Sequence, residues 1–243
     1  MDKMVFDYYE YTNQGGRDYN EDCVGSKTAG DSGLFVVCDG LGGHAHGELA
    51  SACARDTLLA SWSPEIADEE AWLGKTIAGA NEKILALQKE KKCVLKSTVV
   101  ALLIEGRKAC WAHVGDSRLY YIHRGRIWAY TDDHSVAYKK YKAGEITRAM
   151  IGQDEDQSRL LRSLGSEERS EAEVHYCPEE LESGDAFLLC SDGVWEFLRE
   201  DEIVIDLCKS VNAKRWSELL RLRMMDRIDM RNDNLSLLTV MLG

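Results

Sequence analysis

Three apolar segments of this sequence, 34–40, 110–116 and 186–193, each run into an aspartate with a glycine beside it. The aspartates are Asp39, Asp116 and Asp192. A carboxylate at the end of a buried strand is costly unless a cation or hydrogen-bond donors compensate its charge. Taken singly, an Asp-Gly pair after a strand is more often only a turn. Three such sites in one chain favour a shared site that binds a cation.

Two further polar pairs extend this set of oxygen ligands. Glu21 and Asp22 lie near the start of the chain, and Asp233 and Asn234 lie just before the last apolar run. None of the eight cysteines stands in a Cys-x-x-Cys spacing, so the sequence does not support a zinc or iron–sulfur site. Carboxylate and carbonyl oxygens suit hard or borderline cations, and the sequence therefore predicts a Mg²⁺ or Mn²⁺ site.

Six motifs surround these acids in order along the chain: GRDYNED at 16–22, DGLGGHAHGELAS at 39–51, VGDSR at 114–118, TDDHS at 131–135, SDGVWE at 191–196 and DN at 233–234. Together they resemble the motif series of the metal-dependent type 2C (PPM) Ser/Thr protein phosphatases, most closely the small bacterial members. The resemblance extends from about residue 10 to the C-terminus. A lone Asp-Gly-x-Gly-Gly would be weak evidence, but six motifs in the right order are a strong signal.

This resemblance implies an α+β fold in four layers, αββα, with two central and mainly antiparallel β-sheets flanked by helices. It implies that residues 1–243 form a single catalytic domain, and that a flap at about 136–165 lies beside the active site.

The resemblance also implies a two-metal centre of Mn²⁺ or Mg²⁺ at one end of the sandwich. Asp39 would bridge both cations and the Gly40 carbonyl would bind one of them. Asp192 and Asp233 would bind the other, and Asp116 would help to hold a third, weaker cation.

The remaining site residues are expected to support this centre. Glu21 and Asp22 would orient metal-bound waters, and Asn234 would shape its loop. Many eukaryotic members have a histidine directly after the Asp-Gly pair, where this chain has Leu41. His44, three residues further on, would donate a proton, order the metal loop or cap the next helix, and a structural role is favoured for it.

The implied reaction is the hydrolysis of phosphoserine and phosphothreonine by direct attack of a metal-bridging hydroxide. Arg17 would clamp two phosphate oxygens with its planar fork of donors. No phosphoenzyme is required, in keeping with the absence of an obvious Cys-x5-Arg phosphate loop. The alternative is a catalytically weak pseudophosphatase or phosphoprotein-binding regulator of the same fold, whose signature would be the loss of metal aspartates.

Elements that could position these residues are visible in the hydrophobic pattern. Strands are expected near 4–11, 34–38, 97–104, 109–114, 118–122, 126–130, 172–176, 186–190 and 235–241. Many are joined by tight turns that contain glycine, which favours hairpins and an antiparallel sheet. Helices are expected at 48–62, around 73–87, and at about 200–209 and 214–228. The helices come in pairs between blocks of strands, which favours α+β layers.

Composition limits the partners and the compartment. The net charge of −12 argues against a nucleic acid or an anionic membrane as the partner. The absence of a signal core or a long apolar run, together with scattered free cysteines, predicts a soluble cytoplasmic protein. The expected partners are phosphorylated proteins, substrates of a Ser/Thr kinase, and the expected state is a monomer.

Overall fold

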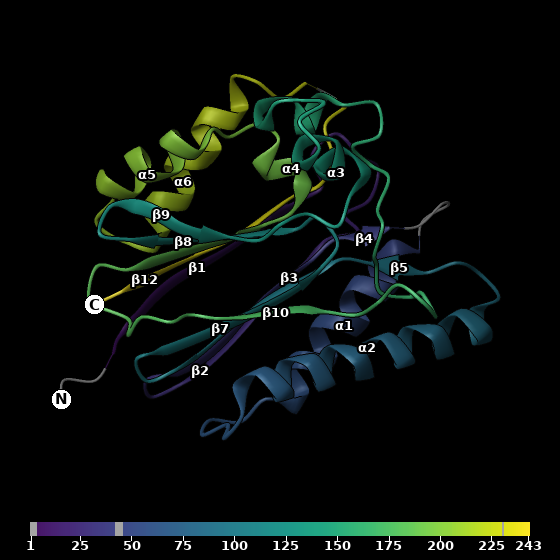
Figure 1. Ribbon diagram of the computed structural model, residues 1–243, viewed down its shortest axis with the longest axis horizontal. Helices are drawn as coiled ribbons and strands as arrows, with labels where there is room; N and C mark the ends of the chain where they lie inside the picture. The colour runs from purple at the N-terminus through teal and green to yellow at the C-terminus, as the bar shows by residue number, and fades with distance from the viewer. Residues whose placement is uncertain (1–3, 42–45, 230) are drawn as a thin grey trace.

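Two five-stranded antiparallel sheets pack face to face in the computed structural model, which describes residues 4–41, 46–229 and 231–243 (Figure 1). The first sheet has the order β1 (Phe6–Asn13), β12 (Leu235–Leu242), β11 (Ala186–Cys190), β8 (Arg118–His123) and β9 (Arg126–Tyr130). The second has the order β10 (Glu173–Tyr176), β7 (Lys108–Val114), β6 (Val99–Glu105), β3 (Ser32–Cys38) and β2 (Cys23–Ala29). A short pair, β4 (Gly40–Leu41) with β5 (Lys96–Ser97), lies beside them.

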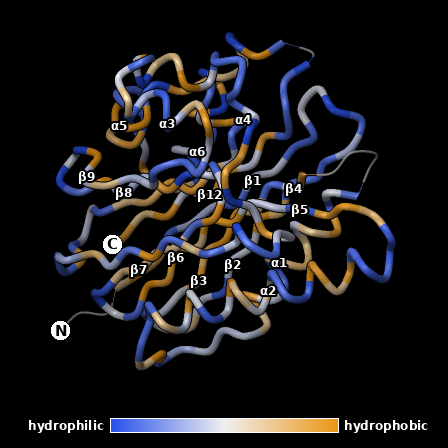
Figure 2. Tube along the Cα trace, turned by 45° about the vertical axis from the view of Figure 1, so that its right-hand side comes forward, coloured by the Kyte–Doolittle hydropathy of each residue, from blue (hydrophilic) through white to orange (hydrophobic). Residues whose placement is uncertain are grey.

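The central strands are apolar on both faces because both faces are covered. In β3, Phe35 and Val37 face the other sheet, whereas Leu34 and Val36 face the helices, and all four side chains are fully buried. Figure 2 shows this hydrophobic interior along the strands of both sheets. A strand buried on both faces reads as a continuous apolar run, and this is why β3 was predictable from its sequence.

Two helices, α1 (Gly47–Ser61) and α2 (Glu69–Lys91), cover the outer face of the second sheet (Figure 1). Asp68 caps α2, since its side chain accepts a hydrogen bond from the Ala71 N–H at 3.0 Å. Leu73, Ile77 and Ile84 then fall on one face and are fully buried against the sheet.

On the other side, α4 (Asp192–Trp195), α5 (Glu200–Cys208) and α6 (Ala213–Met225) cover the first sheet. The segment 136–165 contains α3 (Val136–Lys142) and the 3₁₀ helix η1 (Arg148–Gln153). With helices outside both sheets, the expected four-layer αββα sandwich is confirmed.

Some elements were not expected from the sequence. Strand β2 contains Gly25 and alternates poorly, so no strand was predicted there. Glycine at position 25 lets α1 pack closely on β2, since an added Cβ would meet the Leu59 and Arg55 side chains of α1 at 2.8 and 2.9 Å. The short helices α3, α4 and η1 span too few residues to show a clear helical period.

Among the helices of the described ranges, none combines the length and the apolar character needed to cross a bilayer.

Candidate active site

The acidic residues singled out in the sequence meet at one end of the sandwich. Asp39 follows β3, Asp116 lies two residues after β7, and Asp192 begins α4 directly after β11 and Ser191. Asp22 immediately precedes β2, and Asp233 lies two residues before β12. In antiparallel sheets, strands alternately begin and end at the same edge, and this arrangement brings carboxylates from distant parts of the chain together.

Most of these carboxylates are removed from water. Asp22, Asp39 and Asp116 expose only 6, 8 and 3 % of their surface. Burial raises the pKa of Asp39 well above its ordinary value, and the neighbouring Asp22 and Asp192 raise it further. Burial likewise raises the pKa of Asp116, with Asp192 as the next cause.

The same pattern holds for the other two members of the cluster. The pKa of Asp22 is raised to about 7, first by burial and then by Asp192 and Asp233, although hydrogen bonds from serine hydroxyls oppose the shift. Burial and Asp233 raise the pKa of Asp192. These raised values mean that protein cations do not compensate the charge, and a set of crowded oxygen ligands of this kind fits hard divalent cations.

The backbone around Asp39 is held tightly by Thr98. The Asp39 N–H donates to Thr98 Oγ1 at 3.0 Å, and the Thr98 N–H donates to the Asp39 carbonyl at 2.8 Å. Thr98 Oγ1 also shares a hydrogen bond of 2.7 Å with Ser117, next to Asp116. Thr98 therefore links two acidic loops. Sequence reasoning missed this residue because a threonine before an apolar strand carries no distinctive signal.

Gly40 lies where a side chain has no room. A Cβ on this residue would meet the Gly47 and Glu21 carbonyl oxygens at 2.4 and 2.5 Å. The Gly40 N–H donates to the Glu21 carbonyl at 3.1 Å, and Glu21 Oε1 accepts from the Gly47 N–H at 2.9 Å. Glu21 thus joins the backbone at Gly40 to the first residue of α1, and its predicted role toward water stays a prediction.

Asn234 holds the loop that carries Arg17. Its Oδ1 accepts from the Glu21 N–H at 2.8 Å, and its Nδ2 donates to the carbonyls of Gln14 and Tyr19 at 2.8 and 2.9 Å. These three bonds engage the whole side-chain amide with the 14–21 loop, and the predicted role of Asn234 in shaping that loop stays a prediction.

Arg17 lies at the exposed rim of the cluster. Its Nη2 is 2.6 Å from Asp233 Oδ2, and the two side chains are 57 and 40 % exposed. Both residues line a cleft of about 530 Å³, together with Asp192, Glu196, Gln157 and Arg231. A guanidinium and carboxylates that share an open cleft can receive a phosphate group once cations compensate the acids.

Glu196 and Gln157 are site residues to which the sequence reasoning gave no role. Burial, followed by Asp192 and Asp233, raises the pKa of Glu196 to about 8. Gln157, from the 136–165 segment, donates hydrogen bonds to Glu196 and, at 3.4 Å, to Asp192. Glu196 closes the SDGVWE motif, which was the available signal for it, whereas an isolated glutamine gives none. His44 lies outside the described residues.

Comparison with known proteins identifies the arrangement. A family model described as "Protein phosphatase 2C" matches residues 13–226, which is most of the chain. The chain belongs to the protein phosphatase 2C family. Its similarity to the type 2C phosphatases, inferred from six motifs, is thereby confirmed.

Individual members of this family agree with the match. The serine/threonine phosphatase Stp of Listeria monocytogenes is 31% identical over 195 residues, covering 77% of each chain. Protein phosphatase PhpP of Streptococcus pneumoniae is 30% identical over 175 residues, covering 70% of each.

Solved structures show the same fold. The serine/threonine phosphatase of S. agalactiae superposes with a TM-score of 0.84 at 25% identity, covering 98% of this chain and 100% of that one. The catalytic domain of the phosphatase PstP, solved in complex with two manganese ions, gives a TM-score of 0.82 at 26% identity and covers 98 and 99%.

Proposed function

We propose that this protein is a metal-dependent phosphatase that hydrolyses phosphoserine and phosphothreonine in proteins. The observation that carries the proposal is the convergence of Asp22, Asp39, Asp116 and Asp192, from separate strand ends, beside the cleft of Arg17 and Asp233. Membership of the protein phosphatase 2C family and the similarity to a two-manganese PstP structure support it.

Asp39 and the Gly40 carbonyl would hold one cation, and Asp39, Asp192 and Asp233 would hold a second. Asp116 would contribute to a third, weaker position. When bound, Mn²⁺ or Mg²⁺ lowers the pKa of water and neutralises charge on phosphoryl oxygens, so that hydroxide can attack phosphorus directly. Glu21 and Asp22 would orient the water molecules of this centre.

The side chains of the cleft bind and orient the substrate. In this structure the Arg17 guanidinium compensates the Asp233 carboxylate. When another cation compensates Asp233, the fork of Arg17 donors is free to face two oxygens of a phosphate. An open cleft can admit a phosphorylated side chain carried on a peptide, and the proposed substrates are phosphoproteins produced by a Ser/Thr kinase.

A phosphoprotein-binding regulator without turnover is the weaker alternative. Such a protein would not need a complete set of metal aspartates, whereas Asp39, Asp192 and Asp233 are all present at the same end of the sandwich.

Hydrolysis of p-nitrophenyl phosphate by purified protein tests the proposal. We expect activity with added Mn²⁺ or Mg²⁺, none in EDTA, and nearly complete loss in Asp39→Ala and Asp192→Ala. Asp56→Ala, a change of an exposed aspartate on α1, is the matched control and should be fully active. Activity that survives chelation and both substitutions would refute a metal-dependent phosphatase. Calorimetry showing no metal binding at all would favour the binding regulator.

A further inference from the structure

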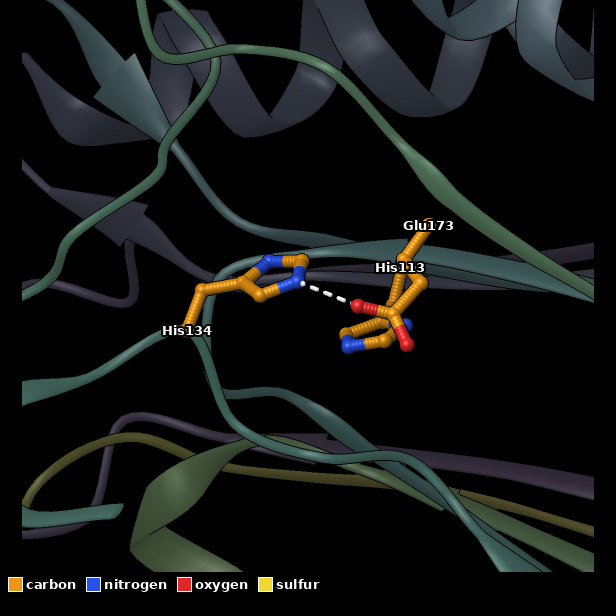
Figure 3. Close-up of side chains that lie close together, drawn as sticks. All are labelled: His113, His134 and Glu173. Carbon is orange, nitrogen blue, oxygen red and sulfur yellow. Dashed lines mark hydrogen bonds and ion pairs between the residues drawn. The ribbon is translucent and has the colours of Figure 1, made fainter. Parts of the chain in front are cut away.

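A second group of polar side chains, His113, His134 and Glu173, lies next to the Asp116 loop at the β10 edge of the second sheet (Figure 3). His113 is on β7, Glu173 is opposite it on β10, and His134 is in the segment after β9. The two imidazole rings stack with their centroids 4.4 Å apart and their planes 11° apart. His134 Nε2 lies 3.2 Å from Glu173 Oε2. His113 is fully buried and His134 is 8 % exposed.

Two histidines and a carboxylate are a common metal-binding set, and the three nearest ligand atoms lie within 4.8 Å of one another. The hydrogen bonds of His134 argue against this use. The Gly115 N–H donates to His134 Nδ1 at 3.2 Å, so Nδ1 must carry a lone pair. In a neutral ring the proton is then on Nε2, from which it is donated to Glu173.

The surroundings keep the ring neutral. The pKa of His134 is lowered to about 4, first by burial and then by the adjacent His113 and the Arg162 guanidinium, against the opposing effect of Glu173. Arg162 Nη1 lies 3.5 Å from His134 Nε2. The Nε2 lone pair that a metal would need is therefore not available, and the ring serves as a hydrogen-bonding link.

We propose that His134 is a positioning residue for the Gly115–Asp116 turn, and that Glu173 selects the ring tautomer that lets His134 accept the Gly115 N–H. This inference rests on the proposed function, in which Asp116 holds a cation. His134 makes two hydrogen bonds to Gly115, since its own backbone N–H also donates to the Gly115 carbonyl at 2.9 Å.

The Gly115–Asp116 turn is in contact, through Thr98, with the loop that carries Asp39. Gly115 has φ of +103°, and an added Cβ would lie 2.6 Å from Thr98 Cγ2, so the turn packs directly on Thr98. Thr98 in turn makes the two hydrogen bonds to Asp39 described above. A contact path thus leads from Glu173 through His134, Gly115 and Thr98 to Asp39.

The orientation of the His134 ring is fixed by its neighbours. His113 stacks on it, and His113 Nε2 is 2.8 Å from the Asp132 carbonyl, two residues before His134. The His134 carbonyl accepts from the Leu161 N–H at 2.7 Å, which ties the same residue to the far end of the 136–165 segment. The position of His134 is therefore fixed twice, by the stacking of His113 on its ring and by the hydrogen bond to its backbone carbonyl.

Two substitutions separate the ring's two hydrogen bonds. In His134→Asn the amide oxygen can take the place of Nδ1 and accept from Gly115, but the contact with Glu173 is lost. In His134→Gln the longer amide reaches toward Glu173 but places no acceptor at the Nδ1 position. Glu173→Ala removes the group that selects the tautomer, and Glu171→Ala, which changes an exposed glutamate two residues earlier, is its control.

Mn²⁺ binding by calorimetry, the steady-state kcat and KM, and the melting temperature are measured for each variant. Loss of a residue that supports a metal ligand typically weakens metal affinity by about tenfold or more. We expect this loss in His134→Gln and a smaller loss in Glu173→Ala, with lower kcat and unchanged KM. His134→Asn should stay within about twofold of the wild type, as should Glu171→Ala.

Three results would overturn the inference. His134→Asn and His134→Gln could have equal effects on Mn²⁺ affinity, which would show that the ring only fills space. Glu173→Ala could equal the wild type. An extra equivalent of Zn²⁺ could bind the wild type and be lost in Glu173→Ala, which would make the cluster a metal site. Wild-type protein that neither binds nor responds to Mn²⁺ would instead refute the proposed function, and the inference with it.

Discussion

The Arg17 guanidinium and the Asp233 carboxylate are both predicted to serve the reaction, yet in this structure they bind each other at 2.6 Å. An exposed pair of this kind contributes little to stability, typically about 0–1 kcal/mol. Breaking this ion pair therefore costs little free energy when Asp233 binds a cation and Arg17 binds a phosphate. At this scale, the sequence predicted which residues gather, but not that two of them would be paired before any ligand binds.

Arg17→Lys tests the clamp. Lysine keeps the charge but lacks the planar fork of donors, so we expect kcat/KM for a phosphothreonine peptide to fall by about tenfold or more. Mn²⁺ affinity should not fall, because Arg17 competes for Asp233. Arg124→Lys, in the exposed Arg124–Glu182 pair, should be unchanged in steady-state assays. Equal kcat/KM for Arg17→Lys and the wild type would remove Arg17 from the substrate site.

Strands and long helices were largely predictable from the sequence, whereas the elements that shape the cleft were not. Strand β11 was predicted at its observed bounds, 186–190, and α1 within one residue, because apolar runs and helical periods are local signals. Strand β2 packs Gly25 closely against the side chains of α1, and such a tertiary contact is not visible in a local pattern. Gln157 reaches Asp192 only because the 136–165 segment folds over the strand ends. Contacts of that kind leave no periodic trace.

Gly40→Ala tests how closely the first residue of α1 approaches the backbone at Gly40. The added Cβ would lie 2.4 Å from a backbone oxygen that cannot rotate away, so we expect a loss of about 2–3 kcal/mol in the free energy of unfolding, with weaker Mn²⁺ binding. Gly79→Ala in α2 is the matched control. No atom lies within 4 Å of its added Cβ, and helix propensity predicts a gain of about 0.5–1 kcal/mol. Denaturant unfolding measures both, and an unaffected Gly40→Ala would contradict the packing described.

The contact between α5 and the turn that follows α6 has a specific pH dependence. Glu202 is 2 % exposed and accepts hydrogen bonds of 2.7 and 2.6 Å from Arg227, which lower its pKa to about 2. Because this pKa is lower in the folded state, the ionised carboxylate stabilises the fold above about pH 4.5, and the contribution is lost as the pH falls toward 2.

We therefore expect Glu202→Gln to cost about 2 kcal/mol at pH 7 and progressively less below pH 4.5. Glu182→Gln, which breaks the exposed pair with Arg124, should cost less than about 1 kcal/mol. Urea unfolding from pH 7 to pH 3 gives the difference between the variants. If the loss of unfolding free energy in Glu202→Gln grew as the pH fell, the pKa of Glu202 would not be lowered in the folded state.

The net charge of the whole molecule is linked to its proposed metal site. The net charge is −12, and part of it is concentrated in a cluster of carboxylates whose burial is costly without cations. Two divalent cations would bring the sum to about −8 and make the cleft locally attractive to phosphate. The molecule is acidic overall. With cations bound at the acidic cluster, the cleft beside it could still attract a phosphate group.

Mn²⁺ should therefore stabilise the whole fold. At a concentration one hundred times the dissociation constant, one site contributes about 2.7 kcal/mol, which corresponds to a rise of several degrees in melting temperature for a chain of this size. Asp39→Asn relieves repulsion in the metal-free protein, so its metal-free melting temperature should equal or exceed that of the wild type. Its response to Mn²⁺ should vanish. An equal Mn²⁺ response in both proteins would exclude Asp39 as a ligand.

Metal-dependent hydrolysis is tested most directly by the rate of phosphate release from a phosphothreonine peptide as chelator-treated protein is titrated with Mn²⁺. We expect no release before Mn²⁺ is added, saturable activation, and a rate at least about a thousandfold lower in Asp39→Asn, since metal stabilisation is worth several kcal/mol. Release that persists in chelator, or an equal rate in Asp39→Asn, would show that Asp39 and a bound metal do not drive the reaction.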